Sequence, residues 1–152
     1  MKHGNFDSRT EARELAMQAL YQLDIQGTGL LELLGEFFIE YATNKNVATL
    51  ASEWTRGTWN NLEICDELIS TSIIKWKMSR LATVDRSTLR LSVYQLKFCP
   101  DIPPKVVINE AIELAKKFGT DKSSAFVNGV LDAVLKKISS ETQDQKDGAK
   151  QA

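Results

Sequence analysis

Two pairs of arginines are the residues best spaced for chemistry, and that chemistry is the binding of a polyanion. Arg86 and Arg90 stand four residues apart, as do Arg9 and Arg13. Residues at this spacing share one face of a helix, so each pair could present two cations to a phosphate backbone. Tyr21, further along the same predicted helix, offers a ring on which a base could stack.

The competing interpretation of these arginines is structural. Each could form an ion pair within its own helix, because acidic residues stand nearby in the sequence. The acidic residues concerned are Asp85, Glu11 and Glu14. Spacing alone favours neither interpretation.

Residues suited to catalysis or metal binding are few. The single histidine is His3, and the two cysteines, Cys65 and Cys99, form no CxxC pair. The sequence has no GxGxxG motif, Walker loop or HExxH motif, and one terminal histidine cannot complete a Ser–His–Asp triad. We therefore expect no enzyme activity, metal or cofactor, and we expect both cysteines to be small buried hydrophobic residues in a reducing compartment.

The net charge of −1 hides two neighbouring segments of opposite sign. Residues 27–74 contain seven acidic and two basic side chains, whereas residues 75–105 contain seven basic and two acidic side chains. The segments could attract each other, or the basic one could bind a polyanion. Taken alone, such a pattern more often indicates a solvated surface.

Every periodic stretch of the chain has the helical period, which predicts an all-α protein. The predicted helices cover residues 9–26, 30–42, 49–71, 84–98, 104–118 and 122–138, with one short turn in the connector 72–83. The predicted boundary residues are Ser8 with Glu11, Thr83, Pro104, Gly119 and Asp121. Gly57 lowers helix propensity inside its helix, which indicates close contact with another helix.

Length and composition predict one globular domain over residues 9–138. The flanking residues 1–8 and 139–152 are polar and aperiodic, so we expect a flexible N-terminus and a disordered tail. No apolar run approaches the ~18 residues that cross a bilayer, and no signal peptide is recognisable. We expect a cytoplasmic protein without a membrane partner.

Several spaced motifs resemble the family of the transcription antitermination factor NusB. These motifs are ARELAMQALYQLD at 12–24, the string Trp76-x-x-x-Arg80-Leu81-x-x-Val84-Asp85-Arg86-x-x-Leu89-Arg90, PPKVVINEAIELAKKFG at 103–119 and SSAFVNGVLD at 123–132. The resemblance spans about residues 9–138. It implies a bundle of about seven helices in two packed subbundles, the first built from the N-terminal helices.

The resemblance also implies a function without catalysis. Family members bind the boxA element of nascent ribosomal RNA together with NusE, a ribosomal protein. The complex joins RNA polymerase and suppresses premature termination. Some members self-associate and hide their RNA surface, so a homodimer is another state to test.

The binding residues that the resemblance implies lie in three regions. The RNA surface falls on the start of the first helix and on the approach to the last helix. Its residues are Arg9, Arg13, Gln18, Tyr21, Arg90, Lys122, Ser123 and Phe126. Asp85 and its neighbour Arg86 correspond to the surface that faces NusE.

Two departures from the family pattern bear on RNA binding. Members usually open with an arginine-rich arm, whereas residues 1–26 carry three basic and four acidic side chains here. Because phosphate neutralisation supplies much of RNA affinity, this predicts weaker binding by the isolated protein. Position 122, commonly acidic in the family, is Lys122, which adds a cation near the expected RNA path.

Two alternative functions fit parts of the sequence. A helical scaffold that binds proteins and has lost RNA contact would explain the weakly basic N-terminus. NusB-like domains also precede the catalytic domain of some RNA methyltransferases, but only 14 residues follow Ile138 here, too few for a methyl-donor fold.

Overall fold

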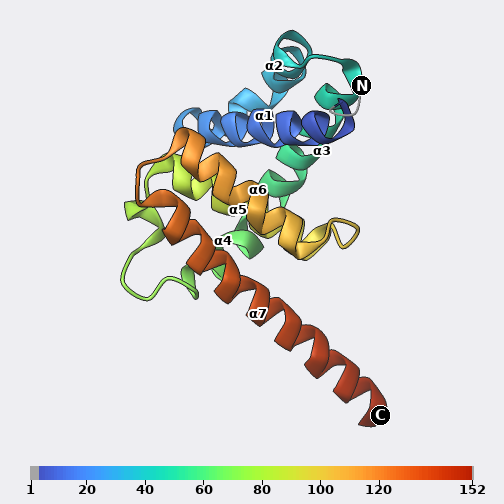
Figure 1. Ribbon diagram of the computed structural model, residues 1–152, viewed down its shortest axis with the longest axis vertical. Helices are drawn as coiled ribbons and strands as arrows, with labels where there is room; N and C mark the ends of the chain where they lie inside the picture. Colours follow the sequence, from blue (N-terminus) through green and yellow to red (C-terminus); the bar gives the residue numbers. More distant parts are fainter. Residues whose placement is uncertain (1–3, 152) are drawn as a thin grey trace.

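The structure is a computed structural model that describes the backbone of residues 4–151 and the side chains of residues 8–145. Over this part of the chain it is helical, without strands (Figure 1), which confirms the predicted all-α class. The α-helices are α1 (Gly4–Gln26), α2 (Leu34–Tyr41), α3 (Lys45–Asn60), α4 (Leu62–Ser70), α5 (Thr83–Phe98), α6 (Pro104–Phe118) and α7 (Ser123–Gln151). Two short 3₁₀ helices, η1 (Thr28–Leu33) and η2 (Met78–Arg80), lie in the connections.

Two hydrophobic clusters form the core, as the predicted subbundles require. The first is built mainly from α1, α2 and α3, and the second from α4, α5, α6 and α7. Helix α5 serves both, because Leu91 belongs to the first cluster whereas Leu89 and Val93 belong to the second. Tyr94 and Leu96 pack against both clusters, so α5 joins the two halves.

The apolar stripe of α1 explains how the first half is held together. Its members recur three and four residues apart and are all buried: Ala12, Leu15, Ala16, Ala19, Leu20 and Leu23. This period places them on one side of the helix, against α3 and α5.

The predicted helix over 49–71 is wrong in one respect, because the chain forms two helices there. Asn61 separates α3 from α4, and its side-chain amide donates to the Gly57 carbonyl at 2.8 Å. Asn44 lies between α2 and α3 and caps α3 by accepting a hydrogen bond from the Val47 amide at 3.0 Å. Asparagine competes for backbone groups in this way, which periodicity does not register.

Three predicted N-terminal caps are wrong. Ser8 lies inside α1, and Glu11 instead accepts two bonds from Thr43, each at 2.7 Å. Ala82, rather than Thr83, precedes α5. Helix α7 begins at Ser123, rather than directly after Asp121.

The boundaries of α6 are confirmed. Pro104 occupies its first turn, where a missing amide proton costs nothing. Gly119 is the C-cap and donates its amide to the Ala115 carbonyl at 2.9 Å.

Both ends of the described chain are more helical than the sequence indicated. Helix α1 begins at Gly4, and α7 continues past Ile138 to Gln151, along the projection in Figure 1. Residues 139–145 are exposed. This segment is rich in residues compatible with a helix and has no proline, so local preference can extend α7 without a core contact.

Candidate nucleic-acid interface

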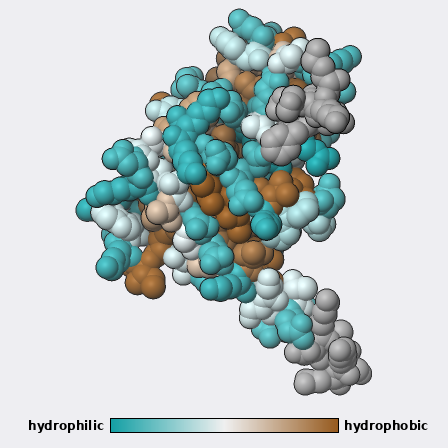
Figure 2. Space-filling view, viewed as in Figure 1, coloured by the Kyte–Doolittle hydropathy of each residue, from teal (hydrophilic) through white to brown (hydrophobic). Residues whose placement is uncertain are grey.

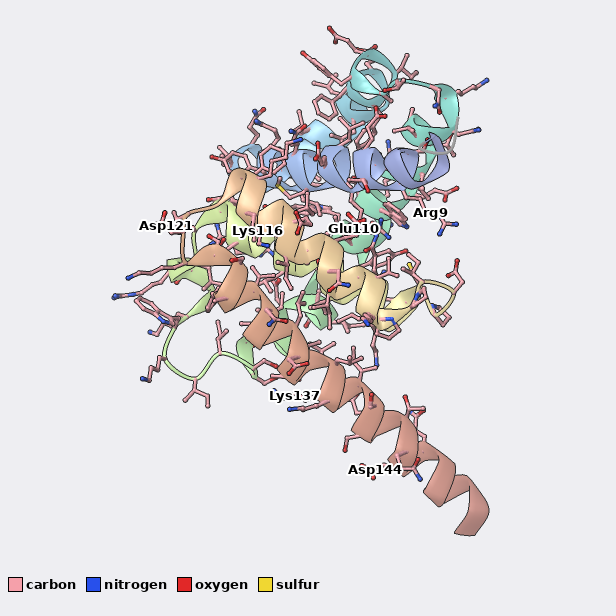
Figure 3. All side chains as sticks on the ribbon, in the orientation of Figure 1. Arg9, Glu110, Lys116, Asp121, Lys137 and Asp144 are labelled. Carbon is pink, nitrogen blue, oxygen red and sulfur yellow. The ribbon has the colours of Figure 1, made fainter. Side chains whose placement is uncertain are left out.

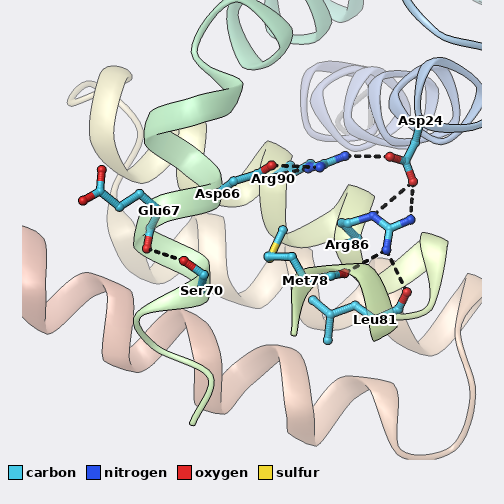
Figure 4. A network of polar contacts seen from close by, with 8 residues as sticks. All are labelled: Asp24, Asp66, Glu67, Ser70, Met78, Leu81, Arg86 and Arg90. Carbon is cyan, nitrogen blue, oxygen red and sulfur yellow. Dashed lines mark hydrogen bonds and ion pairs between the residues drawn. The ribbon is translucent and has the colours of Figure 1, made fainter. Parts of the chain in front are cut away.

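Arg86 and Arg90 lie within an ion-pair network that joins α1, α4 and α5 (Figure 4). The Arg90 Nε and Nη2 atoms donate to the Asp66 carboxylate at 2.8 and 2.9 Å, and Nη1 donates to Asp24 at 2.9 Å. Arg86 also donates to Asp24, with its Nε at 3.1 Å. Both guanidinium groups therefore bind carboxylates of this chain.

Arg86 is held a second time by the backbone that leads into α5. Its Nη1 atom donates to the carbonyl oxygens of Met78 and Leu81, at 2.9 Å each. The network thus fixes η2 against α5, and ion pairing with Asp85 in the same helix is not what the structure shows for either arginine.

The close approach of these charged groups shifts the pKa values of Asp24 and Arg90. Burial raises the pKa of Asp24, but hydrogen bonds and charges from Arg86 and Arg90 outweigh that effect, so its pKa lies below the ordinary value. Burial lowers the pKa of Arg90, but Asp66 and Asp24 outweigh it and raise this pKa above the ordinary value. Asp24 and Arg90 therefore remain charged at neutral pH.

Arg13 is also buried, with 3% of the residue exposed. Its guanidinium lies 5.1 Å from the centre of the Trp54 ring and 4.0 Å from a Glu110 carboxylate oxygen. Burial lowers its pKa. Glu14, the intrahelical partner considered from sequence, instead pairs with Lys117 on α6 at 2.8 Å.

Arg9 is the exposed member of the first pair, and it lies far from the turn that carries Lys122. Figure 3 labels Arg9 and Asp121 on opposite sides of the molecule. Helices α1 and α6 run in the same direction, because Thr10 bonds to Glu110 at 3.2 Å and Glu14 pairs with Lys117. The second half of α1 therefore leads toward the turn between α6 and α7.

Gln18 and Tyr21 lie on that second half of α1, and both are partly buried. They are separated from Arg9 by two to three helical turns. The structure thus brings the predicted RNA residues to two areas, with Arg9 at one end of α1 and Gln18 and Tyr21 toward the other.

A groove beside the turn between α6 and α7 gathers most of the remaining predicted residues. Its volume is about 350 Å³. It is lined by Trp76, Arg80, Leu81, Ala82, Asp85, Thr120, Lys122, Ser123 and Phe126. Residues assigned to RNA therefore share one groove with Asp85, which was assigned to the protein partner.

The predicted residues differ in what they offer to this groove. Lys122 is exposed and Phe126 is partly buried. Ser123 is buried, and its Oγ accepts a hydrogen bond from the Thr120 amide at 3.0 Å, so it organises the turn. One carboxylate oxygen of Asp85 is buried without a hydrogen-bond partner among the described residues.

Trp76 and Arg80 line the groove but were not among the predicted site residues. The sequence contained a signal for them, because Trp76 stands between Lys75 and Lys77 and Arg80 follows shortly after. Aromatic residues interleaved with cations are typical of single-stranded nucleic-acid binding.

The family model described as "NusB family" matches residues 10–136 of the chain. The chain belongs to the NusB family. The transcription antitermination protein NusB of Anaeromyxobacter dehalogenans strain 2CP-1 is 46% identical over 127 residues, covering 83% of this chain and 89% of that relative.

Solved NusB structures share the fold. The T. maritima NusB structure has a TM-score of 0.77 and 41% identity, and the match covers 84% of this chain and 90% of that one. A structure of antitermination factors NusB and NusE in complex with dsRNA contains a chain with a TM-score of 0.78 and 32% identity, covering 86% of this chain and 98% of that one.

Among the described residues, no group of three or more His, Cys, Asp or Glu side chains could hold a metal ion. None of the described helices is long and apolar enough to span a bilayer. Cys65 is buried and Cys99 is partly buried, and both are free thiols.

Proposed function

We propose that this protein is a transcription antitermination factor that binds boxA-type RNA together with NusE, within the antitermination complex of RNA polymerase. The observation that carries the proposal is the likeness, in sequence and fold, to a NusB chain from a complex with NusE and dsRNA. Curated relatives named transcription antitermination protein NusB support it. Its action would be non-catalytic and cytoplasmic, and its free thiols suit a reducing compartment.

The RNA-binding residues divide into two groups under this proposal. Arg9, Gln18, Tyr21, Lys122 and Phe126 would touch RNA, since each keeps at least part of its side chain accessible. The remaining three would not touch RNA but would hold the surface residues in position, since each is buried and hydrogen-bonded or ion-paired within the protein. These three are Arg13, Arg90 and Ser123.

The NusE surface would centre on Asp85, with Arg86 as its support. The buried Asp85 oxygen that has no partner among the described residues needs a donor, and a NusE group at the Asp85 edge of the groove could supply one. Arg86 is bound to Asp24 and to two backbone carbonyls, so it would hold the start of α5 in position.

Titration of a boxA-type RNA tests the proposal directly. The RNA is titrated with this protein, with NusE and with their equimolar mixture, at two salt concentrations. We expect the mixture to bind most tightly and to weaken as salt rises, because phosphate contacts release counterions. A mixture that binds no better than either protein alone, without a salt slope, would contradict the proposal.

The acidic end of the molecule favours a second candidate, a protein-binding scaffold or homodimer with weakened RNA contact. Helix α2 and η1 expose Leu33, Ile39 and Tyr41 among acidic residues that would repel RNA. A stable NusE complex that ignores RNA would favour this candidate. Sedimentation across a concentration series would reveal a homodimer.

A further inference from the structure

The segment between α4 and η2 exposes apolar side chains among cations. Ile74 is 97% exposed and Trp76 is 56% exposed. Figure 2 shows an apolar projection at the lower left, where Figure 1 draws this segment. Lys75 and Lys77 flank Trp76 in the sequence and are also exposed. Residues 75–80 carry three basic and no acidic side chains.

Trp76 is also part of the groove beside the α6–α7 turn. It shares that lining with a second aromatic residue, Phe126, and with the cations Arg80 and Lys122. Asp85 is the single carboxylate in the lining. An exposed aromatic ring bordered by cations is the combination with which proteins stack bases and neutralise phosphates of single strands.

The neighbouring arginines are not available to bind phosphate. Arg86 and Arg90 form ion pairs with Asp24 and Asp66 of the same chain. The basic side chains accessible beside the groove are instead Lys75, Lys77, Arg80 and Lys122. These four side chains form no ion pair among the described residues, so their charges are available to attract a polyanion.

We propose that Trp76 is a base-stacking platform for single-stranded RNA, and that Lys75, Lys77, Arg80 and Lys122 bind the phosphates on either side. The proposal rests on the proposed function and adds the residues that carry it. Residues 75–80 would also supply the positive charge that an arginine-rich arm supplies in other family members. Their net charge is +3, whereas residues 1–26 have a net charge of −1.

Substitution of Trp76 tests the stacking role in the complex with NusE. Trp76→Ala should weaken RNA binding about 5- to 100-fold, the range measured when a stacking aromatic is truncated. Trp76→Phe keeps a ring and should recover most of the affinity. Tyr41→Ala is the matched control, because Tyr41 is 61% exposed on the acidic helix α2, and it should bind RNA like the wild type.

Substitution of the flanking lysines tests the phosphate contacts. The double variant Lys75→Ala/Lys77→Ala should lower the slope of log K against log salt by about 1.4, at ~0.7 for each phosphate contact of a single strand. Lys105→Ala is the control, because this exposed lysine lies at the opposite end of α6 from Lys122. Its slope should match that of the wild type.

The outcomes separate this inference from the function on which it rests. Wild-type protein that binds no RNA with NusE present overturns the proposed function. Wild-type protein that binds RNA, with Trp76→Ala binding equally well and the lysine variant keeping its slope, overturns this inference alone. Loss of NusE binding by Trp76→Ala in the absence of RNA would show that the segment binds protein instead.

Discussion

At the scale of single residues, Arg90 shows how a buried cation can support a binding surface without contacting the ligand. Its guanidinium makes three hydrogen bonds to two carboxylates from α1 and α4. These bonds use three of the five N–H groups of the guanidinium, and only 8% of the residue is exposed, so Arg90 binds carboxylates of this chain and is little accessible to a phosphate in solvent. Its contribution is therefore to stability and to the position of α5.

Arg90→Ala should reduce the free energy of unfolding by about 3 kcal/mol, because it leaves Asp66 without its counter-ion and removes one of the two arginines that pair with Asp24. Urea denaturation measures this loss, and Lys105→Ala should stay within about 0.5 kcal/mol of the wild type. If Arg90→Ala is as stable as the wild type and loses RNA affinity, Arg90 contacts RNA directly.

Stability should also depend on the protonation of Asp24. Its pKa is lower in the folded protein than the ordinary value of ~3.9, so the folded state binds fewer protons. The stabilisation is present above about pH 4 and is lost as pH falls through the folded pKa. Urea midpoints should thus be nearly constant from pH 7 to 5 as far as Asp24 is concerned, and fall below pH 4.

Asp24→Asn provides the comparison for that pH series. The variant should be less stable at pH 7, with a shallower decline in acid, because the titrating carboxyl is gone. A decline as steep as in the wild type would assign the acid sensitivity to other carboxylates.

At the scale of elements, the crossing of α3 and α5 depends on one missing side chain. A Cβ atom at Gly57 would lie 2.2 Å from Tyr94 Oη and 2.3 Å from its Cζ. The Tyr94 ring also lies 5.6 Å from the Phe98 ring, so moving it disturbs a packed neighbour.

Gly57→Ala should therefore destabilise the protein by about 1 kcal/mol, since overpacking at ~1–3 kcal/mol exceeds the ~1 kcal/mol gained in helix propensity. Gly35→Ala in α2 is the control, because nothing lies within 4 Å of its added Cβ, and it should be neutral or stabilising. Equal denaturation midpoints for the two variants would contradict the crowding at Gly57.

The end of α7 should contribute little to stability. Removal of residues 140–152 should change the free energy of unfolding by less than about 1 kcal/mol, because the described side chains in it, residues 140–145, are exposed and the Lys97–Glu141 ion pair that it deletes is exposed too. Amide exchange of this segment should be fast, because its helix is exposed and should open locally at little cost. A loss above 2 kcal/mol would mean that the tail packs on the domain.

At the scale of the whole molecule, α5 makes one folding unit of two hydrophobic clusters. Its opposite faces belong to different clusters, and α6 likewise contributes Val107 and Leu114 to the first cluster and Ala111 and Ala115 to the second, so the two cores share helices and should unfold together. Thermal or urea unfolding should follow a single transition, with near- and far-ultraviolet circular dichroism coinciding. Two separate transitions would show that the halves fold independently.

The sequence alone determined the helical class, the division into subbundles, the family and the tight contact at Gly57. The helical class and the contact at Gly57 follow from periodicity and glycine chemistry, whereas the family and its two subbundles follow from linear motifs that resemble a known family. Tertiary structure decided which arginines form ion pairs and with which carboxylates. An arginine can reach any carboxylate that the fold brings near, however far apart the two residues lie in the sequence. Asp24 lies more than 60 positions from Arg86 along the chain, yet they form an ion pair. Only the packing of the helices therefore distinguishes the arginines that are paired inside the protein from the cations that are accessible to a ligand.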